Sequence, residues 1–195
     1  MTQPQDIRAR RARGDDIFGI DVSSIRTVTS LMKIALFTGT LAHMTTANLE
    51  ISKATLDWSD FRTVRQGTYG EEDAEAGAVI TVVRTRDPSV VRIRVRHVAN
   101  VERGAEHTPS LLRHEQGHLD MAIIAARLMK VDIDAGVHPE IAFHQHGEAY
   151  LAANHRYDDM TAHGRDTGAQ ASWNTALQIA LAQEPAPCFV NTVLL

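Results

Sequence analysis

Apolar side chains recur at helical spacing over three segments in the second half of the chain. The clearest segment runs from Thr108 to Lys130. It opens with a threonine whose hydroxyl can accept a bond from a first-turn amide, followed by Pro109, whose missing N–H has no helical partner in any case. Its apolar positions form one helix face, namely Leu111, Leu112, Leu119, Ala122, Ile123 and Ala126. Similar signals predict helices from His138 to about Arg156 and from Thr167 to Gln183.

The middle of the chain alternates with the period of two that a half-buried β-strand requires. Ala78–Arg86 and Ser89–Ala99 flank the turn dipeptide Asp87-Pro88, so they predict a β-hairpin. In the second of these runs, valine and isoleucine alternate with arginine, which predicts one buried face and one solvated face. Asn48–Leu56 predicts another strand, and Arg62–Gly77 a loop. Strands that precede helices indicate an α+β fold, with a small, mainly antiparallel sheet packed on the first helix and a helical C-terminal part.

The predicted helix at residues 108–130 contains the HExxH pattern, as His114, Glu115 and His118. Positions four apart lie one above the other on a helix, so both imidazoles can bind one metal ion. Zn²⁺ in catalytic sites takes three protein ligands and leaves its fourth position to water. Glu115 would stand beside that water, where it can take a proton as the water attacks a carbonyl carbon and pass it to the leaving nitrogen. The structural alternative is a pair of helix histidines bonded to nearby carboxylates without a metal.

A third ligand must come from the segments that follow this helix. Glu148 could serve from the next helix, and His163 could be brought back over the metal by the loop after it. His144, His146 and His155 are further candidates, and the first two are only two residues apart, so they cannot share a helix face. The residues alone leave these alternatives open.

Three blocks of the sequence match one known family in their order. The first is His114–Asp120 (HEQGHLD) with Ala125–Arg127 close behind, and another is Leu56–Phe61 (LDWSDF) upstream. The remaining block comprises Tyr157, Asp158, Thr161, His163, Gly164, Gln170, Trp173 and Asn174, a YDxxTxHG element followed by a helix. Together these blocks, which span about residues 49–180, resemble a bacterial family of predicted secreted zinc-dependent proteases in the zincin-like peptidase clan.

The resemblance implies a zincin-like fold and a zinc-dependent metallopeptidase, an endopeptidase that hydrolyses peptide bonds through a zinc-activated water. It also implies that His163 is the third zinc ligand beside His114 and His118, that Glu115 is the general base, and that the partner is a peptide or protein substrate. The family has a Ser-Trp pair ahead of the metal helix that this chain does not contain near Gly104–His107. The alternative is therefore a catalytically inactive zinc-binding or protein-interaction module on the same fold.

Other polar residues of these blocks have two possible roles each. Tyr157 could donate a hydrogen bond to the oxyanion that forms as water adds to the amide, or it could fix the local structure through a bond to backbone. Asp158 and Asp120 could orient a ligand histidine through its second ring nitrogen. For Asp120 a solvated position is the expected one. Gln170 and Trp173 are expected to be structural.

Composition sets limits on partners and on metal chemistry. At 195 residues, with 44% apolar side chains, the chain suffices for one globular domain with tails. The net charge is −4 and no long basic stretch occurs, so no nucleic-acid partner is expected. Cys188 is the only cysteine, which excludes an internal disulfide and a thiolate metal cluster.

The metalloprotease domain is predicted at residues 49–184, between an N-terminal arm, residues 1–48, and a tail, residues 185–195. Residues 1–19 are rich in arginine and predict disorder. Residues 32–47 resemble a short secretory signal, so translation from Met32 would give a secreted or periplasmic protein, and otherwise a cytoplasmic one. The alternative is an amphipathic helix that begins at Ser23 or Ser24 and packs on the domain. The apolar run is shorter than the roughly 20 residues of a membrane span.

Overall fold

A computed structural model describes residues 17–20, 45–69 and 73–183 of the chain. These residues form an α+β fold in which strands precede helices, as the hydrophobic pattern predicts. The strands are β1 (Ile17–Ile20), β2 (Thr46–Ile51), β3 (Arg62–Val64), β4 (Ala74–Arg84) and β5 (Val90–Glu102). The helices are α2 (Pro109–Asp134), α3 (Pro139–Thr161) and α4 (Thr167–Ala182), and a short 3-10 helix spans Trp58–Asp60.

The sheet is mixed, with strand order β1-β4-β5-β2 and with β3 also paired to β5. The predicted hairpin is confirmed, since β4 and β5 pair antiparallel from Ala74–Val101 to Arg84–Val91. Both β2 and β3 instead run parallel to β5, which departs from the expected mainly antiparallel sheet. Period-two alternation reports which face of a strand is buried and carries no information about the direction of its neighbour, so the parallel pairings left no local signal.

Two N-terminal expectations change. Residues Ile17–Ile20 fall partly within the arm expected to be disordered, yet they pair antiparallel with β4 as β1. Strand β2 begins at Thr46, so the last residues of the signal-like segment belong to the sheet. The rest of that segment, the alternative helix from Ser23 or Ser24 and the C-terminal tail lie outside the described residues. The expected loop at 62–77 contains β3 and the start of β4.

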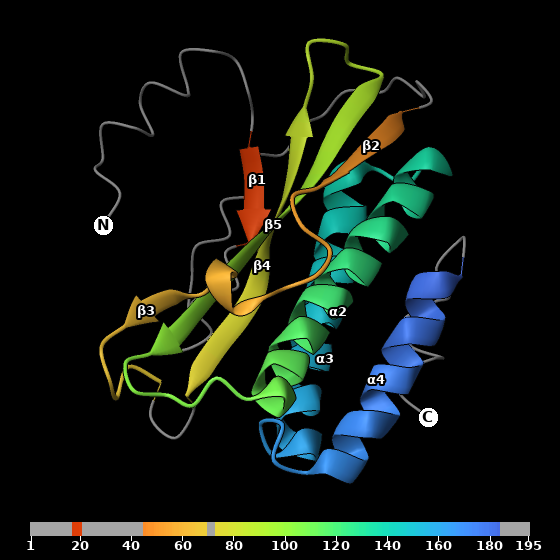
Figure 1. Ribbon diagram of the computed structural model, residues 1–195. Coiled ribbons are helices and arrows are strands. Elements are labelled where there is room, and N and C mark those ends of the chain that lie inside the picture. Colours follow the sequence, from red (N-terminus) through yellow and green to blue (C-terminus); the bar gives the residue numbers. More distant parts are fainter. Residues whose placement is uncertain (1–16, 21–44, 70–72, 184–195) are drawn as a thin grey trace.

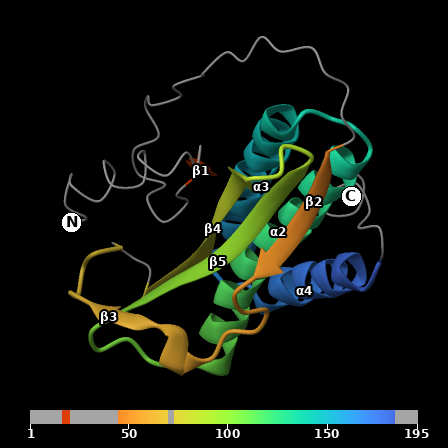
Figure 2. The same ribbon diagram turned by 90° about the horizontal axis from the view of Figure 1, so that it is seen from above.

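All three helices lie on one side of the sheet, with α2 and α3 packed side by side and α4 next to α2 (Figures 1 and 2). Helix α2 begins where the sequence predicts, because the Thr108 hydroxyl accepts a hydrogen bond from the amide of Leu111. It continues to Asp134, four residues beyond the predicted end, and α3 likewise continues to Thr161. Among the described helices, none is long and apolar enough to cross a membrane.

The buried face of β4 changes in side-chain size along its length. Its first three buried residues are Ala74, Ala76 and Ala78, and the next two are Ile80 and Val82. Small side chains let a helix backbone approach closely, whereas branched ones fill a wider space. The N-terminal half of α2, with its HExxH residues, therefore packs beneath the alanine end of β4.

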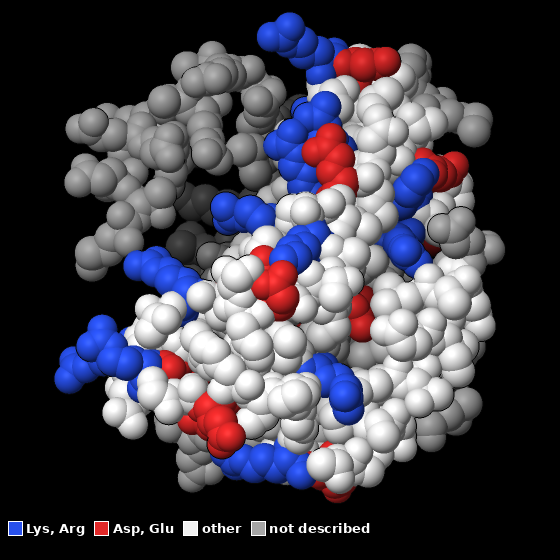
Figure 3. All heavy atoms as spheres, in the orientation of Figure 1, with Lys and Arg blue, Asp and Glu red and all other residues white. Residues whose placement is uncertain are grey.

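The opposite side of β5 meets solvent, as the alternation predicts. Arg92 and Arg94 each form an ion pair with Glu50 of β2, with N–O distances of 2.9 Å. All three side chains are about half exposed, so these pairs contribute little to stability. Basic and acidic side chains are interspersed on the face that Figure 3 presents.

Candidate metal site

Two histidines of α2 meet through their Nε2 atoms. His114 and His118 are one helical turn apart, and their Nε2 atoms are separated by 3.3 Å. Both residues are buried, with 2% and 8% of their surface exposed. The spacing of the HExxH pattern thus gives the expected convergence of two imidazoles.

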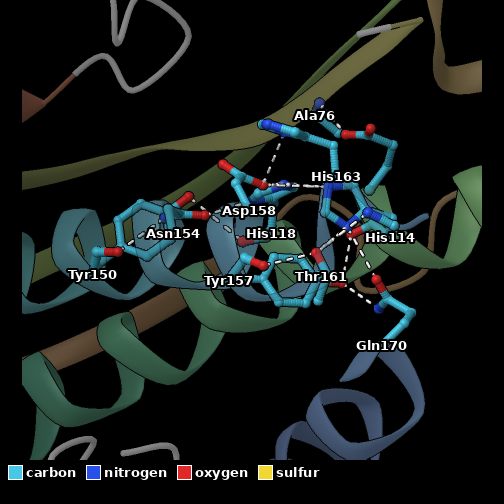
Figure 4. A network of polar contacts seen from close by, with 12 residues as sticks. Ala76, His114, His118, Tyr150, Asn154, Tyr157, Asp158, Thr161, His163 and Gln170 are labelled. Carbon is cyan, nitrogen blue, oxygen red and sulfur yellow. Dashed lines mark hydrogen bonds and ion pairs between the residues drawn. The ribbon is translucent and has the colours of Figure 1, made fainter. Parts of the chain in front are cut away.

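The third member of this group is Asp158, from the last turns of α3. Its Oδ1 lies 3.3 Å from Nε2 of His114 and 3.1 Å from Nε2 of His118 (Figure 4). This oxygen is buried and, as long as both histidines are neutral, receives no hydrogen bond from the described residues. The three residues form a group that could hold a metal ion, since their ligand atoms all lie within 4.8 Å of one another. Asp158 therefore faces the same point as the two Nε2 atoms and does not orient a histidine through its other nitrogen.

The opposite ring nitrogens are held by two side-chain amides. Nδ1 of His114 lies 3.1 Å from Oε1 of Gln170, and Nδ1 of His118 lies 2.5 Å from Oδ1 of Asn154. The amide nitrogens donate to other acceptors. Nε2 of Gln170 donates to the hydroxyl of Tyr157, and Nδ2 of Asn154 donates to the carbonyl of Tyr150. Both amide oxygens therefore accept, so each Nδ1 carries the proton and each Nε2 presents a lone pair. Gln170 has a site role as well as a structural one, and Asn154 gave no signal in the sequence.

This arrangement concentrates lone pairs in a buried space. Burial opposes a charged imidazolium at His118, but the hydrogen bond and charge of Asp158 outweigh it and raise the pKa of His118 to about 9. Burial lowers the pKa of His114. Burial alone would raise the pKa of Asp158, yet its bonds to the two histidines hold it well below the ordinary value. The group attracts a cation, which in the absence of a metal is a proton on His118.

Glu115 lies on the same turn of α2 and is 2% exposed. Its Oε2 accepts a hydrogen bond of 2.5 Å from the backbone N–H of Ala76 on β4. The alanine face of β4 provides the room for this contact. The bond fixes the carboxylate between the sheet edge and the two histidines.

A pocket of about 770 Å³ opens over this group. Its walls come from β4 and the loop before it, from the start of α2, and from the end of α3 with the loop that follows. His114, Glu115, His118, Asp158 and His163 all line it. The predicted general base and the group that could hold a metal ion thus share one cavity.

Tyr157 stands behind the histidines and is not among the residues that line the pocket. Its ring stacks on His114, with centroids 4.7 Å apart, and its hydroxyl donates to the carbonyl of His114 over 3.1 Å. A methyl group at Gly117 would overlap this hydroxyl, which explains the glycine of HEQGH. The geometry corresponds to the backbone-bonding role that the sequence left open.

Of the candidates for a third ligand, His163 lies near the group and Glu148 does not. Nδ1 of His163 is 4.0 Å from Oδ1 of Asp158, but His163 is not a member of the compact ligand group. Glu148 is exposed on α3 and does not line the pocket. His146 is buried, and its Nε2 lies 2.7 Å from the carboxylate of Asp132.

Asp120 is buried, where the sequence suggested a solvated acid. Its carboxylate accepts hydrogen bonds from the amides of Gln116 and Gln178, and burial raises its pKa to about 6. Gln116 also bonds to the backbone of Ala54 and Leu56, so these hydrogen bonds join the segment between β2 and β3 to α2.

Comparison of the chain with protein-family models, with curated proteins and with solved structures finds no match.

Proposed function

We propose that this protein is a zinc-dependent metallopeptidase with a zincin-like fold, in which His114, His118 and Asp158 hold the metal and Glu115 is the general base. The observation that carries the proposal is the convergence of two imidazole Nε2 lone pairs and the Asp158 carboxylate beside the buried Glu115. A scaffold without a metal has no need to assemble three lone-pair donors away from water.

The distances suit zinc. Ligands about 2.0–2.1 Å from a tetrahedral zinc ion stand about 3.3 Å from one another. The three contacts in the group are 3.1, 3.3 and 3.3 Å. Two imidazoles and one carboxylate are also a ligand set typical of catalytic zinc, which keeps one position open.

A bound zinc ion supplies Lewis acidity that activates water and polarises a carbonyl. Glu115, on the same turn of the helix, takes the proton from the attacking water and returns it to the leaving nitrogen as the C–N bond breaks. Gln170 and Asn154 keep Nδ1 of each histidine protonated, so that both Nε2 atoms are available as ligands. The N–H of Ala76 limits the orientations that the carboxylate of Glu115 can adopt.

An extended peptide fits the pocket as substrate. Strand β1 pairs with β4 only from Ile80 onward, so the described sheet offers no second neighbour to Ala74–Val79. The first four residues of β4, from Ala74 to Gly77, also line the pocket. The N–H of Ala76 is taken by Glu115, so an extended peptide would pair with the remaining backbone groups of this edge and present one of its bonds for attack.

The test combines metal content with hydrolysis. Protein purified without chelator, and again after addition of Zn²⁺, is examined by elemental analysis and assayed on fluorescently labelled casein. We expect about one zinc per chain and casein cleavage that Glu115→Gln lowers by about 10²–10⁴-fold while zinc is retained. Wild-type protein that takes up no zinc would contradict the metal site, and zinc without any cleavage would favour the inactive binding module.

A further inference from the structure

The loop after α3 contains the two non-glycine residues with positive φ in the described chain. Ala162 has a φ of 48°, His163 of 55°, and Gly164 follows with 79°. Side chains at such angles are strained, and the strain persists only where contacts fix the backbone. The N–H of His163 donates to the carbonyl of Asp158 over 3.0 Å, and a methyl group at Gly164 would come within 2.8 Å of Cβ of His114. The backbone of His163 is thus held against the metal-binding group.

The imidazole of His163 faces the pocket without joining the ligand group. Its side chain is 37% exposed, and it lines the cavity together with Glu115. Nδ1 lies 4.0 Å from Oδ1 of Asp158, whereas each Nε2 of the two helix histidines lies within 3.3 Å of that oxygen. The position is close enough to reach a molecule bound at the group and lies outside the compact set that would surround a metal.

Three tyrosine hydroxyls near the pocket are already bonded within the protein. Tyr157 donates to the carbonyl of His114, and Tyr150 approaches the carbonyl of His118 at 3.5 Å. The hydroxyl of Tyr69 bonds to Glu75, and burial together with this carboxylate raises the pKa of Tyr69. An imidazole can donate from either nitrogen according to its tautomer, so His163 can serve as a donor without being charged.

We propose that His163 is a catalytic residue that donates a hydrogen bond to the scissile carbonyl oxygen, while Asp158 and not His163 completes the metal ligands. This inference rests on the proposed peptidase function. It assigns to His163 the role that the sequence suggested for Tyr157.

The chemical step conserves the proton of His163. Water oxygen bonds to the carbonyl carbon, one water proton passes to Glu115, and the carbonyl oxygen gains negative charge. The N–H of His163 donates to that oxygen and keeps its proton. When the C–N bond breaks, Glu115 returns its proton to the amine, the carbonyl re-forms and the hydrogen bond weakens. Removal of a single donor of this kind from other enzymes lowers kcat by about 10²–10³-fold.

The experiment uses the full chain loaded with Zn²⁺ and compares four variants with wild type. His163→Ala removes the donor, His163→Gln retains an N–H, and Asp158→Asn weakens the proposed ligand. His144→Ala is the control, because this histidine lies on α3 outside the pocket. Zinc affinity is measured by competition with a chromophoric chelator, the visible spectrum is recorded after loading with Co²⁺, and kcat and KM are measured on labelled casein.

We expect His163→Ala to keep about one zinc, an affinity within about threefold and an unchanged cobalt spectrum, with kcat lower by about 10²–10³-fold. His163→Gln should recover part of the loss, and Asp158→Asn should weaken zinc binding and alter the spectrum. Loss of zinc in His163→Ala would make His163 a ligand, as the resemblance implies, and would overturn the inference. Full kcat in that variant would overturn it as well. Failure of the peptidase function is recognised separately, because wild type itself would then show no cleavage.

Discussion

Helices α2 and α3 are joined at two places by contacts between buried histidines and a carboxylate, and the two places differ in the number of acceptor atoms that meet. Near the end of α2, Asp132 meets His146 of α3, with 2.7 Å between Oδ2 and Nε2. Toward the start of α2, Asp158 of α3 meets both His114 and His118. The first contact joins one acceptor to one ring nitrogen, so one proton satisfies it. In the second contact the Nδ1 protons of both histidines are donated to amide oxygens, so the two Nε2 atoms and Oδ1 of Asp158 meet as three acceptors. One proton cannot provide a hydrogen bond to all three atoms.

The comparison separates a structural histidine from a ligand histidine by the number of lone pairs and protons. Burial does not separate them, because His118 and His146 are equally buried at 8% exposure. Sequence position does not separate them either, since both lie on long helices. The group formed by His114, His118 and Asp158 has more lone pairs than protons, and such an excess favours a bound cation.

The largest effect is expected from removal of the shared carboxylate. Asp158→Ala leaves two imidazoles as ligands, so the Kd for zinc should rise by about a thousandfold or more, which corresponds to about 4 kcal/mol. Asp132→Ala, the equivalent change at the other contact, should leave zinc affinity unchanged. Chelator competition measures both, and equal zinc affinity in the two variants would remove the distinction drawn above.

The next largest effect concerns the amides that hold the ligand histidines. Asn154→Ala and Gln170→Ala free the Nδ1 proton and allow the rings to rotate, so each should weaken zinc binding by about 10–100-fold. Gln178→Ala is the matched control, because this glutamine of α4 bonds Asp120 and contacts neither ligand histidine. A loss of zinc affinity in the control as large as in the two variants would point to a general effect on helix packing.

Zinc binding should depend on pH because zinc displaces a proton from the metal-free protein. The pKa of His118 is raised to about 9, above its ordinary value of about 6.5, so the folded protein holds this proton through neutral pH. Zinc affinity should therefore rise by about tenfold per pH unit through neutral pH and level off above about 9. The stability of the metal-free protein should depend on pH in the opposite direction to zinc affinity. The contribution of this proton to the free energy of unfolding is complete below about pH 6.5 and is lost as pH rises through about 9. Calorimetry in buffers of different ionisation enthalpy counts the released proton, and release of none at pH 7 would contradict the prediction.

The smallest effect is expected at the structural contact. His146→Ala removes the partner of the Asp132 carboxylate, which is partly exposed and can be solvated by water, so the free energy of unfolding should fall by about 0.5–1.5 kcal/mol. Zinc affinity should stay within about twofold of wild type, because neither residue touches the metal-binding group. Urea unfolding of the metal-free protein gives the first quantity, and chelator competition gives the second.

Local signals predicted most of the helical framework. Thr108-Pro109 fixed the start of α2, and the apolar spacing gave α4 from Thr167. The i, i+4 spacing of His114 and His118 placed both rings on one helix face without any tertiary information. The hairpin of β4 and β5 followed from alternation around Asp87-Pro88, and the parallel partners β2 and β3 did not, because those contacts join segments far apart in the chain.

The remainder of the site depends on how α3 and α4 approach α2. Gln170 is 56 residues from His114, and Asn154 is 36 residues from His118, so no spacing rule could pair them. The sequence marks Asp158 as an acid that could meet a ligand histidine, but whether its carboxylate faces Nε2 or Nδ1 depends on the rotation of α3. For Tyr157 the sequence leaves an oxyanion donor and a backbone bond open, and only the close packing at Gly117 shows that its hydroxyl faces the helix backbone.

The alanine end of β4 also bears on how the sheet chooses its register during folding. Ala74, Ala76 and Ala78 alternate with Glu75 and Gly77. A slip of β4 by one residue would turn Glu75 toward α2 and move the N–H of Ala76 away from the carboxylate of Glu115. The misaligned pairing would bury an uncompensated charge and leave the carboxylate of Glu115 without its donor, so this sequence disfavours the nearest wrong register at the strand end that contacts Glu115.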